Sequence, residues 1–349
     1  MLALSAPDAV SLAIRRTRDF LFHPFRWGTY LKLGLVAILT EGFANSSHSS
    51  HHTGPSPEHA SPSAVLHHLT PGTIAVIIAA LLLAFVVALF VFYLITRLRF
   101  AYFHCLTTGN RRIRPGWHLY RLQAARFFWF NVVVGICFLL AAALMILPFA
   151  AGLFHLIRHT APGGQPDLVQ LLPLVLPLIP IVLLLALAGF LSDIVLRDWM
   201  MPHFALENAT PRQAWAQVWM RFTAEKRQFL AFTLLRVTLP LIAYVVLFIL
   251  LTIPGLFAVG AMAMFGFGVH GALAGATGAS SIAAIALEVF FGILAFGIVL
   301  LASICLAGPV CTAIREYALL FYGSRYQTLG NLLDTPPPPS ANSAAPRMA

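Results

Sequence analysis

The feature that most constrains this chain is a series of long, uninterrupted apolar blocks. The clearest block, residues 73–96, reads TIAVIIAALLLAFVVALFVFYLIT and contains no charged residue. About 20 apolar residues are needed for an α-helix to cross the roughly 30 Å hydrocarbon core of a bilayer. Because lipid offers no hydrogen-bond partner to the backbone, such blocks have to be helical. The whole chain is 59% hydrophobic and 10% charged, whereas charged residues make up about a quarter of a typical soluble domain. We therefore expect an all-α, polytopic membrane helix bundle.

Six such blocks predict about six transmembrane helices. Residues 1–333 are expected to form a single membrane domain, and residues 334–349, DTPPPPSANSAAPRMA, a disordered cytoplasmic tail. Residues 254–270 leave three alternatives open, namely a helix extension, a re-entrant segment or an extra span. The predicted spans are 28–44, 73–96, 127–151, 170–195, 229–253 and 282–308.

The positions of the basic residues predict the orientation. With six spans, 19 of the 22 Lys and Arg residues fall on one side of the membrane. An excess of Lys and Arg marks cytoplasmic loops, so both the N- and the C-terminus are expected in the cytoplasm. The same pattern explains the net charge of +10 without nucleic acid, because the basic residues are spread over membrane-proximal loops. The expected partners are the lipid bilayer and its anionic headgroups; any protein partner is left unidentified.

Residues 45–72 form a predicted extracytoplasmic loop rich in His, Ser and Pro. His48, His51 and His52 are its candidate metal ligands, because imidazole binds Zn, Cu and Ni. The surrounding Ser, Pro and Gly residues offer no packed second shell to orient such ligands. We interpret the loop as a connector, keep loose metal binding as the alternative, and expect no cofactor.

Five ionisable residues lie inside the predicted spans: Lys32, Glu41, Asp193, Arg236 and Glu288. Charges within a membrane are costly unless they are paired or hydrated. Arg236 and Asp193 lie toward the cytoplasmic ends of their helices and could pair. Glu41 and Glu288 lie toward the outer ends, where two carboxylates could bind a cation or share a proton. These residues either position the helices or line a transport path.

Amphipathic segments precede the spans on the cytoplasmic side. Thr210 and Gln213 have the spacing of a capping box at the start of a helix. Trp215, Val218, Trp219 and Phe222 then recur at the spacing of one helical face, which suits a helix in the headgroup region. A similar helix is predicted near the N-terminus, with one apolar face made by Val10, Ile14 and Leu21.

Four segments resemble an uncharacterised family of bacterial multi-pass membrane proteins with a domain of unknown function. They are LFHPFRWGTYLKLGLVAIL, RLRFAYFHCL, RDWMMPHFAL and GPVCTAIREYALLFYG. The family is distantly similar to the membrane domain attached to some glycerophosphodiester phosphodiesterases. Its motif residues match Pro24, Phe25, Asp198, Trp199 and Pro202. The resemblance implies a six-helix protein of the bacterial cytoplasmic membrane and no enzymatic activity.

No catalytic motif is found, so no catalytic residue is predicted and an enzyme is not expected. We favour a non-enzymatic protein that organises lipid or a partner protein through a basic, Trp-rich cytoplasmic face. The alternative is a small transporter or permease whose path is lined by the intramembrane charges.

Overall fold

The computed structural model describes residues 4–42, 71–159, 172–173, 175–272 and 279–334. Within these residues the secondary structure is helical, with no strand, as the apolar blocks predict. By its internal contacts the chain divides into two compact units, and the single membrane domain expected for residues 1–333 stays a prediction. Unit 1 comprises residues 1–56, 101–116 and 225–349, and unit 2 comprises residues 57–100 and 117–224.

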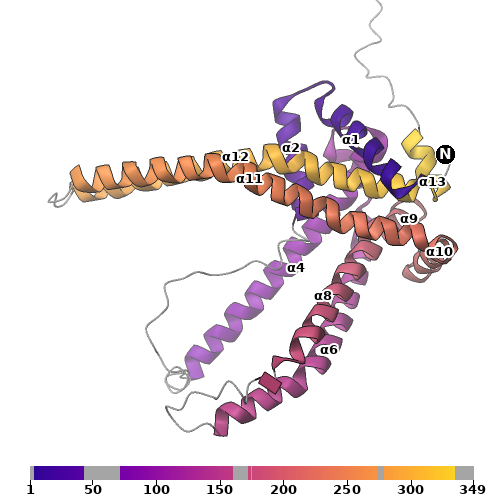
Figure 1. Cartoon of the computed structure of the whole chain (residues 1–349), viewed down its shortest axis with the longest axis horizontal. Helices are drawn as coiled ribbons and strands as arrows, with labels where there is room; N and C mark the ends of the chain where they lie inside the picture. The colour runs from indigo at the N-terminus through magenta and orange to yellow at the C-terminus, as the bar shows by residue number, and fades with distance from the viewer. Residues whose placement is uncertain (1–3, 43–70, 160–171, 174, 273–278, 335–349) are drawn as a thin grey trace, which may run out of the picture. The chain divides into compact units, whose positions relative to one another are not determined.

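Unit 1 is organised around α12 (Ala279–Gly323), which packs against α1 (Ala6–Phe22), α2 (Trp27–Ala37) and α11 (Lys226–Ala272) (Figure 1). The π-helical turn η1 (Ile38–Gly42) extends α2. The short helix α13 (Gln327–Asp334) folds back onto α12, and residues 101–108, the last turns of α4, complete the unit.

The contact between α1 and α12 depends on small residues. Ala6, Ala9 and Ala13 are at most 1% exposed, which lets the two helix backbones approach closely. Of the residues on the apolar face predicted for this helix, Leu21 is buried, whereas Ile14 is 58% exposed. Alanine faces α12 because little space separates the helices, and the larger Ile14 is left outside.

Unit 2 contains most of α4 (Pro71–Thr108), the end of α5 (Ile113–Leu119), α6 (Arg121–His159) and α8 (Leu178–Ile194). After α8 follow the π-helical η3 (Val195–Met200), α9 (Met201–Leu206) and α10 (Pro211–Ala224). Aromatic rings join these elements. Phe127 of α6 lies 5.2 Å from Phe204 of α9 and 5.6 Å from Phe100 of α4, measured between ring centroids.

Among the described residues, five helices are long and apolar enough to cross a membrane, and each overlaps one of the predicted blocks. They are Gly72–Thr108, Arg121–Gly152, Leu178–Leu206, Lys226–Phe257 and Val289–Gly323. Their apolar surface is largely unpacked within the chain, as lipid-facing helices require. Residues 254–270 are helical and continue α11, which favours the helix extension among the three alternatives.

The first predicted span, residues 28–44, differs from the other five. Its described part consists of α2 and η1, which together cover only residues 27–42. At about 1.5 Å per residue this segment is about 24 Å long, less than the hydrocarbon thickness. It is therefore not among the five helices that are long enough to cross the hydrocarbon core.

Two predicted features lie outside the described residues. They are the His-rich loop with His48, His51 and His52, and the tail at 335–349. In the part of the chain that the structure describes, no group of three or more His, Cys, Asp or Glu side chains is placed to hold a metal ion.

Candidate functional site

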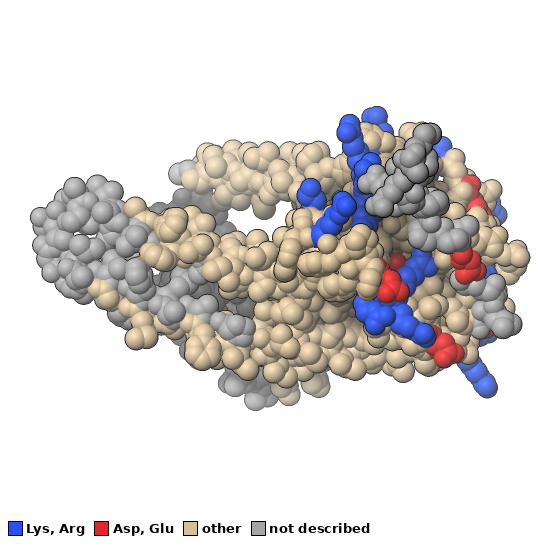
Figure 2. Space-filling view, turned by 90° about the horizontal axis from the view of Figure 1, so that it is seen from above, with Lys and Arg blue, Asp and Glu red and all other residues tan. Residues whose placement is uncertain are grey.

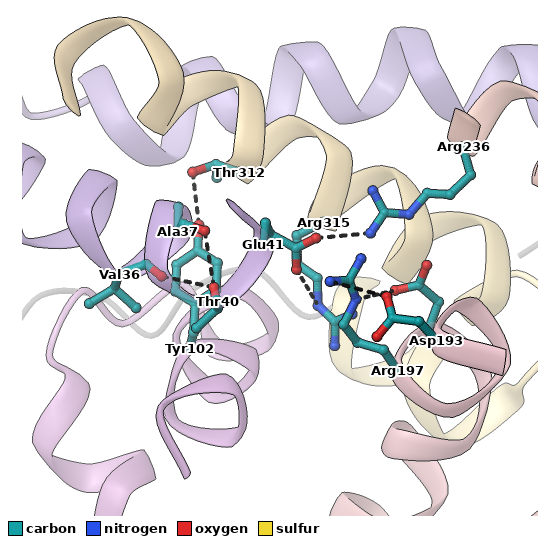
Figure 3. Close-up of polar contacts among 11 residues, drawn as sticks. Val36, Ala37, Thr40, Glu41, Tyr102, Asp193, Arg197, Arg236, Thr312 and Arg315 are labelled. Atoms are coloured by element: carbon teal, nitrogen blue, oxygen red, sulfur yellow. Dashed lines mark hydrogen bonds and ion pairs between the residues drawn. The ribbon is translucent and has the colours of Figure 1, made fainter. Parts of the chain in front are cut away.

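A cluster of buried charges joins three elements of unit 1 (Figure 3). One carboxylate oxygen of Glu41, on η1, accepts a hydrogen bond of 2.9 Å from Nη2 of Arg236 on α11. Its other oxygen lies 3.9 Å from Nε of Arg315 on α12. The three side chains are 5%, 5% and 3% exposed. Glu41 thus ties the end of the first apolar segment to both long helices of the unit.

The local structure of the first segment turns Glu41 toward this cluster. Gly34 and Gly308 let α2 and α12 touch, since a Cβ on Gly308 would lie 2.7 Å from the Gly34 Cα. Beyond this crossing the helix widens into the π-helical η1, a geometry that occurs frequently at functional sites. The Thr40 hydroxyl donates to the Val36 carbonyl at 2.8 Å, so this polar side chain is satisfied within its own helix.

A second buried ion pair lies between α1 and α12. Nε of Arg16 is 3.3 Å from a carboxylate oxygen of Glu316, whose side chain is 1% exposed. Both oxygens of Glu316 are buried without a hydrogen bond from any part of the chain that is described. The two terminal nitrogens of Arg16 donate to the carbonyls of Leu106 and Leu333, in the last turns of α4 and α13. Arg16 thus caps two helices and neutralises one buried carboxylate.

The predicted ionisable residues are distributed as follows. Arg236 binds Glu41, a pairing that the sequence did not predict. Asp193 belongs to unit 2, where it lies 3.6 Å from Nη1 of Arg197 and is 38% exposed. Lys32 is exposed on α2. The predicted pair of Arg236 with Asp193 would join the two units and stays a prediction.

The prediction that Glu41 and Glu288 share one depth near the outer ends of their helices is wrong. Glu41 contacts Arg315 on α12, and Glu288 lies 27 residues earlier on the same helix. At about 1.5 Å per residue the two levels are about 40 Å apart. The side chain of Glu288 lies outside the described residues. Glu41 lies close to the basic ends of α11 and α12, where arginine rather than a second carboxylate faces it.

Sequence reasoning missed Arg16, Arg315 and Glu316. The sixth apolar block ends near residue 308, so the sequence places Arg315 beyond the last span, in a separate short interfacial helix on the cytoplasmic side, but α12 continues without a break to Gly323. A signal was present in the spacing, because Thr312, Arg315 and Glu316 follow the i, i+3, i+4 pattern of one helical face. All three residues are buried, and Thr312 also accepts a 2.8 Å hydrogen bond from the Tyr102 hydroxyl.

Helix α10 of unit 2 carries an exposed aromatic surface. The predicted capping box is confirmed. The backbone N–H of Gln213 donates to the Thr210 hydroxyl at 3.4 Å, and the backbone N–H of Thr210 donates to the side-chain oxygen of Gln213 at 3.0 Å. The residues of the predicted apolar face divide between two environments. Val218 is buried, whereas Trp215 and Trp219 are 49% and 53% exposed and stack on each other at 6.1 Å.

A second exposed aromatic cluster marks the corner between α1 and α2 in unit 1. Phe25 stacks on Phe22 at 5.9 Å and lies 5.1 Å from Trp27, which is 63% exposed. Arg111 holds this corner by donating to the carbonyls of Asp19, His23 and Pro24. Burial, with the positive charge of Arg26 nearby, lowers the pKa of Arg111, yet an arginine stays charged in proteins.

The motif residues from the family resemblance fall into two groups. Asp198, Trp199 and Pro202 lie on η3 and α9 and are buried in unit 2, where Asp198 is 3.7 Å from Nε of Arg197. Pro24 and Phe25 form the exposed corner of unit 1. The first group has the burial expected of packing residues, and the second has the exposure expected of an interface.

The exposed apolar helices, with basic and aromatic residues at their ends, define an integral membrane protein of the all-α class. In Figure 2 the coloured Lys, Arg, Asp and Glu side chains gather toward one end of the view, and the described surface toward the other end is tan. The chain belongs to a family of unknown function, DUF7544, whose model matches residues 4–332. Comparison with curated proteins and with solved structures finds no match.

Proposed function

We propose that this protein is a non-enzymatic membrane protein that organises lipid headgroups, or a partner protein bound among them, at the cytoplasmic face of a bilayer. The observation that carries the proposal is the exposed stack of Trp215 and Trp219 on α10, a helix joined by short connections to two spans. Tryptophan is enriched at membrane–water interfaces, where its apolar ring and its N–H group are both accommodated.

Several arginines are available to such a face. Exposed basic residues lie near the ends of the spans, and each one close to an anionic leaflet contributes about 1 kcal/mol of attraction. Arg16, Arg111 and Arg325 are not counted with them because they are engaged in helix capping and ion pairs. The exposed members include Arg15, Arg18, Arg26, Arg112, Arg114, Arg121, Arg126, Arg212, Lys226 and Arg227.

The proposed orientation places both termini in the cytoplasm of a bacterium, with a sixth crossing near residues 28–44. Contacts within unit 1 support a common side for the two terminal helices. Arg325 donates to the Leu4 carbonyl at 3.1 Å, and Arg16 donates to the Leu333 carbonyl at 3.1 Å. A bacterial membrane, and a distant similarity to the membrane domain attached to some glycerophosphodiester phosphodiesterases, are what the family resemblance implies.

The second candidate is a small transporter. It is favoured by the charges of Glu41, Arg236 and Arg315 deep in unit 1, because ionisable residues within spans frequently mark transport paths. Their mutual pairing supports the first candidate instead, since an ion pair that fixes three helices is what helix positioning requires. Flux in proteoliposomes separates the two, because Glu41→Gln in a folded protein should abolish transport only under the second.

The proposal is tested by measuring which lipids stay with the purified protein. Protein extracted in native nanodiscs from a mixed membrane should carry more anionic phospholipid than the bulk membrane contains. Trp215→Ala with Trp219→Ala should reduce this enrichment. Trp129→Ala is the matched control, because Trp129 is 65% exposed on the span α6. The proposal would be overturned if the lipids retained by the wild-type protein had the composition of the bulk membrane and no other protein co-purified with it.

A further inference from the structure

The position of α10 in the chain limits its distance from the bilayer. The candidate span Leu178–Leu206 ends before α10 begins at Pro211, and α11, the next candidate span, begins at Lys226. With 14 residues, α10 is about 21 Å long, and only a few residues connect it to either span. A helix tethered so closely at both ends is held near the membrane surface.

The contacts of α10 within unit 2 fix its rotation about its own axis. Ala214 and Val218 are buried, and the ring of Phe222 lies 6.2 Å from the ring of Trp199 on η3. Gln217 donates from Nε2 to Glu207 at 3.1 Å, which adds a polar contact to the same docked side. The docked side is therefore occupied by the protein itself.

The remaining surface of α10 is both apolar and basic. Trp215, Trp219 and Met220 are 49%, 53% and 62% exposed. Arg212 precedes Trp215 by three residues and Trp219 by seven, so it lies on the tryptophan face. Between Pro211 and Ala224 there is no Asp or Glu, and the helix carries two arginines. A surface of this kind complements an apolar layer covered by negative charge.

We propose that α10 lies in the headgroup layer of an anionic phospholipid leaflet, with Trp215, Trp219 and Met220 inserted below the phosphates and Arg212 paired with a lipid phosphate. This inference rests on the proposed function and names its lipid class and its site. The bilayer is the occupant because α10 is covalently continuous with two lipid-facing spans, and because a basic interfacial helix gains attraction from anionic lipid.

The test is a depth measurement with a nitroxide attached at Met220→Cys in the full-length protein. The exposed Cys137 and the half-buried Cys305 are replaced by Ala, while the two buried cysteines are retained. Collisions with oxygen, which partitions into lipid, are compared with collisions with a water-soluble nickel complex. Reference labels are placed at Leu144, which is 75% exposed on the span α6, and at Thr328, which is exposed on α13.

In vesicles of phosphatidylcholine mixed equally with phosphatidylglycerol, the oxygen-to-nickel ratio at position 220 should fall between those of the lipid and water references. Arg212→Gln should lower the retention of phosphatidylglycerol by roughly fivefold, the change given by one arginine near a charged surface. Removal of phosphatidylglycerol should shift the label at position 220 toward the water reference. Because the tryptophans are left in place, the test does not depend on a variant that fails to fold.

Three outcomes would overturn the inference. A ratio at position 220 equal to the water reference in both lipid mixtures would place α10 in solution. A label shielded from both reagents would mean that protein, either a second copy or a partner, covers this surface. Equal ratios with and without phosphatidylglycerol would remove the anionic specificity. If anionic lipid still co-purifies with the protein in the first case, the proposed function stands and only the site is wrong.

Discussion

Replacing Glu41 by Gln removes one buried negative charge, nearly preserves the side-chain shape, and leaves Arg236 and Arg315 without this counter-ion. At an effective dielectric constant of about 20, charges 2.9 Å apart attract by about 6 kcal/mol and charges 3.9 Å apart by about 4 kcal/mol. Desolvation of the three groups offsets much of this attraction. Removing one partner of a buried pair typically costs about 3–5 kcal/mol, so we expect this loss in the free energy of unfolding.

The free energy of unfolding can be measured by steric trapping in bicelles. Asp193→Asn is the control, because the Asp193 side chain is 38% exposed and its partner Arg197 is 3.6 Å away. Arg197 is buried but keeps Asp198 as a second carboxylate partner at 3.7 Å, so loss of the half-exposed Asp193 charge should cost at most about 1 kcal/mol. The Glu41→Gln and Arg236→Gln variants should be strongly non-additive when combined. A loss below about 1 kcal/mol for Glu41→Gln, or additivity of the two changes, would refute the assignment of Glu41 as the link between these helices.

Three further predictions concern helix contacts. The measured quantity is the free energy of unfolding unless another measurement is named. Gly308→Leu should cost about 1–3 kcal/mol or more because its Cβ meets backbone at 2.7 Å, whereas Gly292→Leu, with nothing within 4 Å on the same helix, should cost nothing measurable. Arg16→Met should cost about 3–5 kcal/mol by leaving the buried Glu316 unpaired, and adding Glu316→Gln should recover part of the loss. Thr210→Ala should remove about 1 kcal/mol from the first turn of α10, seen as faster amide exchange there. Equal effects of the two glycine changes would contradict the first prediction. No rescue by Glu316→Gln would contradict the second, and an unchanged rate of amide exchange in α10 would contradict the third.

The sequence predicted the positions of five spans along the chain because the signal for a span is local. A block of about 20 apolar residues has one inexpensive arrangement in a bilayer, whatever it packs against. The first segment shows where this reasoning stops. Its apolar residues suggested a span over 28–44, but its described helix is short, and Glu41 near its end is bound by charges from two distant helices. Hydropathy describes the free energy of burying a single residue in lipid. It does not include an oppositely charged partner that offsets this free energy.

The faces of the amphipathic helices could not be predicted for a related reason. In a soluble protein the largest apolar side chains of a helix usually mark its buried face. On α1 and α10 the buried positions are instead held largely by small residues such as Ala9, Ala13 and Ala214, and the exposed ones include Ile14 and Trp215. Near a membrane, lipid is a second apolar phase, so a large side chain need not face the protein. The period of the apolar pattern predicts a helix, but it does not determine which face of that helix contacts lipid and which contacts the protein.

The basic residues show why an overall charge count is an incomplete guide to lipid binding. The positive-inside pattern treats every arginine of the cytoplasmic loops alike. In unit 1, however, Arg16, Arg111 and Arg325 donate to backbone carbonyls, several of them in the last turns of helices. Helix C-termini present unpaired carbonyls and a partial negative charge, so a guanidinium satisfies them well. An arginine used in this way stabilises the fold and has fewer N–H donors left for a phosphate. It follows that neutralising an exposed residue such as Arg212 should change lipid retention with little effect on stability, whereas neutralising a capping arginine should do the reverse.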